Sequence, residues 1–282
     1  MKNFKVAIVD ADSILYTVCL AAQEMHYRVE EKVFTDKEEA EEHGEPVKEY
    51  VELRTLDETL EHYRELIGKI GENTGADQID CYTGSSDGNF RKEIATIKPY
   101  KGNRKGPDPL QLEALKEELI STGELIRADS MLEADDQVII EFRKHKANLG
   151  EGNVVLCVID KDAKQEPGWH YNFNTEDLVH IKPIDSLRYF YTQLLIGDSI
   201  DNILGLYKVG ARSTLVKHLY TLEDEVEMFK MIYSEYHKRF GNYASTFIAE
   251  TFVLLYMLRS PDEMEGVYKV MQLLEVIGEA SD

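Results

Sequence analysis

The chain has 282 residues, 43% of them hydrophobic, and a formal net charge of −21 at pH 7. This length allows one large α/β domain or two small ones with a substantial core. Because phosphate backbones attract proteins through Lys and Arg, the acidic balance excludes strong nonspecific binding to nucleic acid and leaves binding to a local basic patch. No apolar run approaches the ~20 residues that span a bilayer, and no secretion signal is recognised, so we expect a cytoplasmic protein without a membrane partner.

The N-terminal region begins with a strand pattern. The apolar, β-branched run over residues 4–10 predicts a buried parallel strand that ends at Asp10. Residues 13–25 favour a helix, and the Glu-rich segment at about 28–49 is interpreted as a charged hairpin or insertion on the solvated surface.

The middle of the chain continues the alternation. We expect a helix at about residues 56–73, strands at 78–83 and 153–160, and a helix that begins near Glu133. Strands that alternate with helices predict a parallel sheet flanked by helices, an α/β fold. After about residue 183 the pattern turns helical, with Tyr189, Phe190 and Tyr191 interpreted as core.

Four short acidic motifs abut apolar segments. They are Asp10-Ala11-Asp12, Glu133-Ala134-Asp135-Asp136, Asp160-Lys161-Asp162 and Asp198-Ser199-Ile200-Asp201. Functional groups of open parallel sheets collect outside the carboxyl ends of the strands, where Asp10 and Asp160 are expected. Residues three apart on a helix share a face, so these motifs can converge on one point.

Carboxylates that gather in one place repel one another, and a fold that collects them normally holds cations there. Oxygen ligands select Mg²⁺ or Mn²⁺, whereas the eight histidines show no zinc-ligand spacing. Two such ions ~4 Å apart can activate water and stabilise the leaving oxygen of a phosphodiester. The alternative for single motifs is structural: Asp12 can cap a helix, and Asp135 and Asp136 can form a solvated first helical turn.

Five ordered motifs and a glycine-punctuated turn resemble the phage and bacterial 5′ nuclease family, which includes 5′–3′ exonucleases, flap endonucleases and the 5′ nuclease domains of bacterial DNA polymerases. The matching segments are Val9-Asp10, Phe90-Arg91 with Tyr100-Lys101-Gly102-Asn103-Arg104, Leu132-Glu133-Ala134-Asp135-Asp136, Asp160-Lys161-Asp162, Gly197-Asp198-Ser199-Ile200-Asp201-Asn202, and the turn at 205–214. They extend from about residue 4 to 220, and their order makes the resemblance far more specific than any single motif.

The resemblance implies a PIN-like α/β core with a central, mostly parallel sheet. Residues 1–183 would form this core, including a helical arch at about 98–130. Residues 184–282 would form a helical region, packed on the core as one unit, with a helix-hairpin-helix element at about 197–220. The implied protein is a monomer, located in the host cytoplasm if phage-encoded.

The family binds two Mg²⁺ ions, for which Mn²⁺ can substitute. By resemblance, one site is formed by Asp10, Glu133, Asp135 and Asp136, and the other by Asp160, Asp162, Asp198 and Asp201; Asp10 and Asp160 also count as catalytic. One departure concerns the strand at 78–83, after which the family usually has an aspartate. Here Gly84 matches that position, so either Asp87 substitutes from a shifted loop or the remaining carboxylates and water suffice.

Basic and glycine residues complete the implied site. By resemblance, Lys101 and Arg104 contact the scissile phosphate from the base of the arch, and Tyr100 stacks on a base. The other implied DNA contacts are Arg91 and Lys105 near the arch, and Gly205, Lys208, Gly210, Arg212 and Lys217 at the helix-hairpin-helix turn. The family also places a monovalent cation, K⁺, at that turn.

The implied activity is Mg²⁺-dependent hydrolysis of DNA at 5′ ends, nicks or flaps, as a 5′–3′ exonuclease, a flap endonuclease or both. RNA–DNA hybrids are further expected substrates if the enzyme removes RNA primers in phage-type DNA replication. Two alternatives stay open: a PIN-type ribonuclease acting on single-stranded RNA, and a catalytically weak DNA-binding paralogue with a defective metal site near Gly84.

Overall fold

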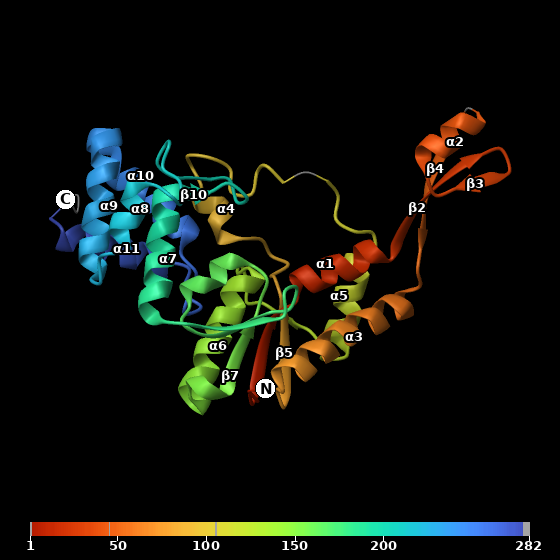
Figure 1. Cartoon of the computed structure of the whole chain (residues 1–282), viewed down its shortest axis with the longest axis horizontal. Coiled ribbons are helices and arrows are strands. Elements are labelled where there is room, and N and C mark those ends of the chain that lie inside the picture. Colours follow the sequence, from red (N-terminus) through yellow and green to blue (C-terminus); the bar gives the residue numbers. More distant parts are fainter. Residues whose placement is uncertain (1, 45, 105, 279–282) are drawn as a thin grey trace.

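The computed structural model describes residues 2–44, 46–104 and 106–278. A six-stranded sheet in the order β6-β5-β1-β7-β8-β9 lies at its centre (Figure 1). Its strands are β1 (Val6–Asp10), β5 (Gln78–Thr83), β6 (Ile126–Arg127), β7 (Val154–Cys157), β8 (Gly168–Asn172) and β9 (Asp177–Ile181). All neighbours pair in parallel except β8 and β9, so the expected α/β fold with a mostly parallel sheet is confirmed.

Helices cover both faces of the sheet because both faces of its strands are apolar. In β1, Ala7 and Val9 point into a core shared with α1 (Asp12–Ala21), α3 (Leu56–Thr74) and α5 (Leu112–Ser121). The alternate residues, Val6 and Ile8, pack against α6 (Ala134–Leu149) on the other face. The carboxyl ends of the parallel strands are thereby left as the open edge of this layered core.

The segment after α1 differs from the expectation. The helix ends at Ala21, and the chain forms a three-stranded antiparallel sheet in the order β3-β2-β4. Its elements are β2 (Gln23–Val29), β3 (Lys32–Phe34), α2 (Lys37–His43) and β4 (Lys48–Leu53). Pairing of β2 with β4 overrides the local helix preference of Gln23, Glu24 and Met25. This projection, called here the acidic arm, extends away from the sheet (Figure 1).

The expectation of a helical arch at 98–130 has to be corrected. After α4 (Phe90–Ile94), residues 98–104 and 106–111 form turns and irregular chain, and α5 packs into the core through Leu112, Leu115 and Leu119. Prolines at positions 99, 107 and 109 explain the absence of a helix between residues 98 and 111 wherever the chain is described, since proline removes a helical hydrogen bond and restricts the residue before it.

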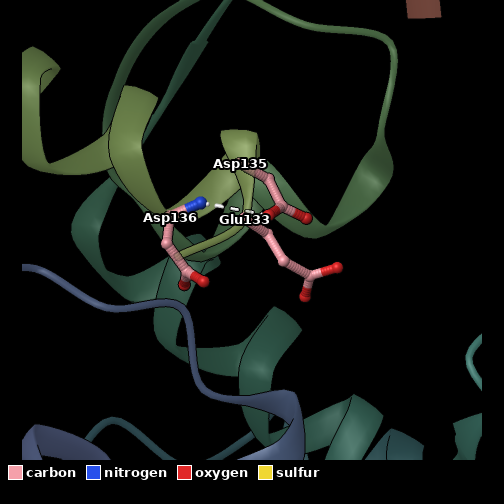
Figure 2. A group of neighbouring side chains, drawn as sticks. All are labelled: Glu133, Asp135 and Asp136. Carbon is pink, nitrogen blue, oxygen red and sulfur yellow. Dashed lines mark hydrogen bonds between the residues drawn. The ribbon is translucent and has the colours of Figure 1, made fainter. Parts of the chain in front are cut away.

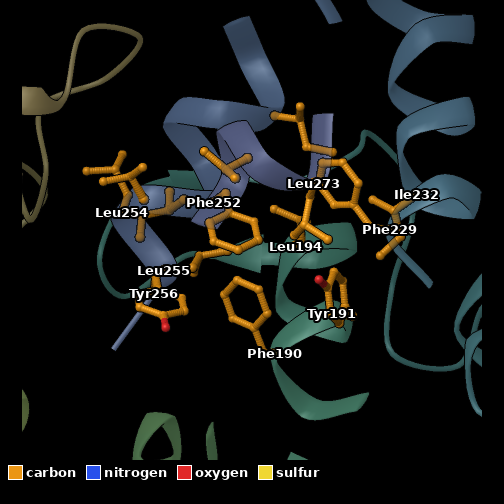
Figure 3. Close-up of a cluster of buried hydrophobic side chains, with 14 of the residues drawn as sticks. Phe190, Tyr191, Leu194, Phe229, Ile232, Phe252, Leu254, Leu255, Tyr256 and Leu273 are labelled. Atoms are coloured by element: carbon orange, nitrogen blue, oxygen red, sulfur yellow. The ribbon is translucent and has the colours of Figure 1, made fainter. Parts of the chain in front are cut away.

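The C-terminal part is mainly helical, as expected. It contains α7 (Pro183–Ile196), the strand pair β10 (Gly197–Asp198) and β11 (Ile203–Leu204), α8 (Thr214–Leu219), α9 (Glu225–Phe240), α10 (Ala244–Leu255) and α11 (Glu265–Val276). Phe190 and Tyr191 are buried among these helices, as expected (Figure 3). The same cluster includes Phe90 and Tyr100, so the hydrophobic core extends across the predicted domain boundary at residue 183. That boundary stays a prediction.

A strand pair separates α7 from the six-residue α8, and the helix-hairpin-helix element stays a prediction. Within residues 2–44, 46–104 and 106–278, no helix combines the length and apolar character needed to cross a bilayer.

Candidate active site

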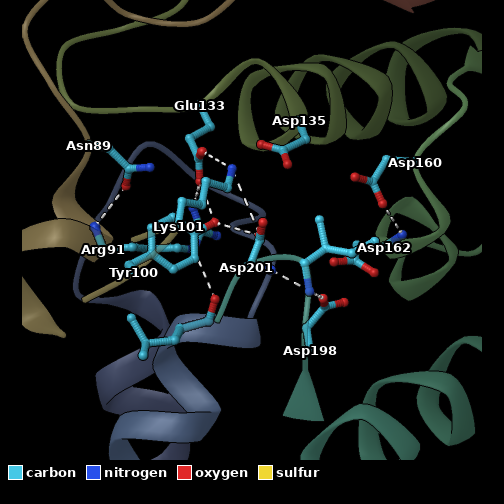
Figure 4. Close-up of polar contacts among 12 residues, drawn as sticks. Asn89, Arg91, Tyr100, Lys101, Glu133, Asp135, Asp160, Asp162, Asp198 and Asp201 are labelled. Carbon is cyan, nitrogen blue, oxygen red and sulfur yellow. Dashed lines mark hydrogen bonds and ion pairs between the residues drawn. The ribbon is translucent and has the colours of Figure 1, made fainter. Parts of the chain in front are cut away.

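Carboxylates from distant parts of the chain meet at the carboxyl edge of the sheet (Figure 4). Asp10 ends β1, and Asp160 follows the adjacent strand β7. A cavity of about 610 Å³ is lined by both, together with Asp12, Glu133 and Asp135. The lining also includes the cations Lys101, Arg104 and Lys161. Charged groups of both signs therefore face one space at the predicted edge.

The start of α6 contributes three carboxylates with different orientations. Carboxylate oxygens of Glu133, Asp135 and Asp136 lie within 4.8 Å of one another (Figure 2). Asp136, however, is fully buried, and its oxygens accept hydrogen bonds from the Arg91 guanidinium at 2.5 and 2.8 Å and from the Leu258 N–H at 3.0 Å. Its carboxylate is thus committed to an internal ion pair, whereas Glu133 and Asp135 face the cavity.

Arg91 and Tyr100 do not reach a DNA surface, in contrast to the expectation. The Arg91 side chain is 2% exposed and also donates to the Leu254 and Tyr256 carbonyls. Tyr100 is 6% exposed, and its hydroxyl donates to Glu133 at 2.9 Å and to Asp201 at 3.0 Å. Both side chains instead hold the carboxylates in place.

Lys101 links the two predicted carboxylate groups. Its ammonium donates to Glu133 and lies 3.8 Å from Asp201. Burial opposes ionisation of Glu133, but the charges of Lys101 and Arg91 hold its pKa at about 2. Burial, followed by the charge of Glu133, raises the pKa of Asp135 well above its usual range. Glu133 is therefore the ionised partner, and Asp135 needs added positive charge to ionise.

The second carboxylate group surrounds the short 3₁₀ turn Lys161–Gln165. Asp160 accepts the Asp162 N–H at 2.8 Å, while Asp198 accepts the Lys161 ammonium at 2.5 Å. Burial, and then the charge of Asp160, raises the pKa of Asp162 to about 6. Asp201, three positions after Asp198, accepts a hydrogen bond from the Arg104 guanidinium at 3.0 Å. It also lies near Lys101, which contacts Glu133, so the second carboxylate group is continuous with the first.

The electrostatics fit divalent cations. Burial raises the pKa of Asp10 to about 7, and the charges of Asp12 and Asp160 add to that increase. The raised pKa values mean that nearby cations do not fully balance the negative charge of these crowded carboxylates. A set of donors made only of oxygen atoms suits Mg²⁺ or Mn²⁺. The residues at this edge therefore fit the metal ions that the motifs imply.

Asp12, rather than Asp87, occupies the corner next to Gly84. Its carboxylate accepts hydrogen bonds from the Thr83 hydroxyl at 2.5 Å and the Gly84 N–H at 3.2 Å. A Cβ on Gly84 would lie 3.4 Å from this carboxylate. Asp87 is exposed and bonds to the hydroxyl of Ser86, and it does not line the cavity. Of the two alternatives for position 84, this arrangement favours reliance on the remaining carboxylates over substitution by Asp87.

Most of the remaining predicted DNA contacts within the described residues are exposed. Arg104 is largely exposed beside the cavity, whereas Lys105 lies outside the described residues. Lys208, Gly210, Arg212 and Lys217 are all exposed around the turn before α8. Gly205 has a packing role instead, because a side chain there would collide with the backbone of Ile196 and Gly197.

Three further residues serve this site: the sequence-based prediction gave Lys161 and Gln193 no role and interpreted Tyr189 as core. Lys161 neutralises Asp198, and Asp162 accepts hydrogen bonds from the Tyr189 hydroxyl at 3.2 Å and the Gln193 amide at 2.8 Å. Tyr189 thus serves the site rather than the core. The four-residue spacing of Tyr189 and Gln193 on α7 puts both on one helix face, and this was the available sequence signal.

No protein-family model matches the sequence, and no curated protein matches it. Two solved structures of a bacteriophage T5 protein match along the whole chain. One, crystallised with metal ions, is 14% identical with a TM-score of 0.50, and the match covers 95% of this chain and 99% of the other. The second is a flap endonuclease in a pseudo-enzyme–product complex with DNA and metal ions, 15% identical with a TM-score of 0.50, covering 96% and 99%. The resemblance to the 5′ nuclease family is thereby confirmed at the level of the fold.

Proposed function

We propose that this chain is a divalent-metal-dependent 5′ nuclease that hydrolyses DNA phosphodiester bonds. The observation that supports it most is that the carboxylates of Asp10, Glu133, Asp135 and Asp160 converge around Lys101 at the carboxyl edge of the sheet. The fold that carries this sheet is similar to that of a flap endonuclease. That flap endonuclease was crystallised with DNA and metal ions.

Two Mg²⁺ ions, with Mn²⁺ as a substitute, are the proposed cofactors. Asp10, Glu133 and Asp135 would hold the first, and Asp160, Asp162, Asp198 and Asp201 the second. We assign Asp136 a positioning role because Arg91 occupies its carboxylate. When bound, the ions supply an activated water and stabilise the leaving oxygen.

The chain's own cations would orient the substrate. Lys101 and Arg104 line the cavity beside the carboxylates, so both can hold the scissile phosphate and offset the negative charge that develops on it. Lys161 is already bonded to Asp198 and would reduce carboxylate repulsion within the second group. These contacts involve the phosphate only and would carry no sequence preference.

Duplex DNA would lie along the exposed turn before α8. Lys208, Arg212 and Lys217 are exposed there, and with Gly210 they would contact phosphates, with K⁺ bound at the turn. The proposed substrates are 5′ ends, nicks, flaps and RNA primers on DNA, attacked by a monomer. A single-stranded RNA ribonuclease would make no use of this turn.

Matched 5′-flap, nicked, blunt and RNA-primed duplexes, with single-stranded RNA as the competing substrate, test the proposal. We expect Mg²⁺-dependent products from the duplexes that EDTA suppresses. Asp160→Asn should abolish hydrolysis and leave DNA binding in place, whereas the matched control Asp87→Asn, on an exposed carboxylate outside the cavity, should remain active. Preferential cleavage of single-stranded RNA, or full activity of Asp160→Asn, would overturn it.

A further inference from the structure

A second cavity, also of about 610 Å³, adjoins the carboxylate site. The two cavities share the wall formed by Lys101, Arg104 and Glu133. The second is bounded by the ends of β5 and β6 and by α4 and α5, through Gly84, Arg127, Lys92 and Lys116. Its volume falls within the ~300–1,000 Å³ of typical small-ligand pockets.

This cavity is basic in a strongly acidic chain. Its lining contains five cationic side chains: Lys92, Lys101, Arg104, Lys116 and Arg127. Three carboxylates face them: Asp12, Glu113 and Glu133. Asp201 and Glu117, just outside the lining, pair with Arg104 and Arg127, so most of these cations are ion-paired. In a chain with a net charge of −21, this concentration of cationic donors still favours a phosphate as the occupant.

Two of the cations, Lys116 and Arg127, are held only by long or exposed ion pairs and can bind a ligand. The Lys116 side chain is 15% exposed, and its ammonium lies 3.5 Å from Asp12 and 3.9 Å from Glu113, beyond ordinary hydrogen-bond length. Arg127 pairs with Glu117 at 2.7 Å, but that glutamate is 69% exposed, and exposed pairs contribute little. Both side chains can therefore donate charge-assisted hydrogen bonds to a phosphate.

We propose that this cavity binds the 5′-terminal nucleotide of the cleaved strand through its 5′-phosphate. The inference rests on the proposed function and deepens it. A DNA strand that crosses the carboxylate site leaves it on two sides. On the side of Asp198 and Asp201 lie the exposed cations proposed to hold the duplex, and on the other side lies the basic cavity. The basic cavity has room for a nucleotide rather than a duplex, and none of the described residues that line it has an aromatic ring to stack on a base.

The consequence is selection of phosphorylated 5′ ends without a base preference. A 5′-hydroxyl end would lack the phosphate contacts to Lys116 and Arg127, which lowers the stability of the bound state. A phosphate that sits in this cavity also sets how far the next phosphodiester lies from the terminus. The expected main product on such ends is a mononucleotide.

The experiment compares kcat/KM on matched blunt duplexes that carry either a 5′-phosphate or a 5′-hydroxyl. We expect a preference for the phosphate of roughly tenfold or more, the size of a charged hydrogen bond. Lys116→Gln and Arg127→Gln should each move this ratio toward one. Lys144→Gln, an exposed lysine on α6 outside the cavity, is the matched control and should keep the ratio.

A binding measurement separates this inference from catalysis. In Asp160→Asn protein, fluorescence anisotropy should show tighter binding of the 5′-phosphorylated duplex, and adding Lys116→Gln should remove that difference. If a Lys116 variant fails to fold, the exposed Lys92→Gln variant replaces it. Metal-dependent cleavage with equal rates on both ends, or a ratio unchanged in the cavity variants, overturns this inference but leaves the proposed function. Failure to cleave any end overturns the proposed function itself.

Discussion

At the residue scale, the carboxylates of the site differ in how closely a cation approaches them. Glu133 lies against Lys101, and Asp198 lies against Lys161, so both have lowered pKa values in spite of burial. Asp10 and Asp162 are buried near other carboxylates, and their pKa values are raised. Chemically similar side chains therefore divide into groups with lowered pKa values, which are ionised at neutral pH, and groups with raised pKa values.

The raised pKa values predict a pH dependence. Asp10 titrates at about 7 and Asp162 at about 6, so both become protonated as the pH falls through this window. Only the carboxylate form binds a metal ion, and we expect kcat/KM to fall as the pH drops from 8 to 5. Since protons and metal ions compete, a higher Mg²⁺ concentration should move the midpoint to lower pH. Initial rates at two Mg²⁺ concentrations check this, and a midpoint that ignores Mg²⁺ would contradict it.

At the element scale, one buried ion pair ties three helices together. Arg91 belongs to α4 and Asp136 to α6, and the guanidinium also contacts the carbonyls of Leu254 and Tyr256 at the end of α10. Asp136 additionally accepts the Leu258 N–H. This connection fixes the helix that presents Glu133 against the C-terminal region that presents Asp198.

Removal of one partner of this pair is predicted to destabilise the fold. Asp136→Asn removes the anion closest to the buried Arg91 charge and leaves only Glu133, at 3.2 Å, which costs about 3–5 kcal/mol of the free energy of unfolding. Urea denaturation measures the loss. The matched control is Arg64→Gln, which breaks the more exposed pair with Glu124 and should cost about 1 kcal/mol or less. Equal losses in the two variants would show that the buried pair does not hold these elements.

At the scale of the whole molecule, charge is distributed unevenly. Residues 23–54, which form the acidic arm, contain eleven Asp and Glu but only five Lys and Arg. The arm projects from the body (Figure 1). The cations of the basic cavity lie instead at the sheet edge. The negative charge of the chain is thus partly concentrated away from the proposed DNA path, and it repels DNA at long range.

Neutralising the arm is predicted to speed DNA association. A variant with Glu31, Glu38, Glu41 and Glu42 replaced by Gln removes four exposed negative charges. The association rate at low salt should rise by up to roughly tenfold, because long-range repulsion decreases. Above ~0.5 M salt the variant and the parent should converge, since screening then acts within a few ångströms. Stopped-flow binding at both salt concentrations measures this, and an unchanged rate at low salt would contradict it.

The sequence by itself determined the parallel sheet and the position of the carboxylates. A short apolar run rich in β-branched residues favours a buried strand, and parallel strands bring Asp10 and Asp160 to the same edge. The order of the acidic motifs also predicted the fold that the solved structures confirm.

Only the tertiary structure decided which motif residues face the cavity. Sequence spacing puts Asp136 beside Glu133, but packing turns it toward Arg91, and the same packing buries Tyr100. The basic cavity was equally hidden, because Lys116 and Arg127 meet Lys101 only when α5, β6 and the chain after α4 come together. Side-chain orientation depends on contacts between segments far apart in sequence, and local patterns contain no information about those contacts.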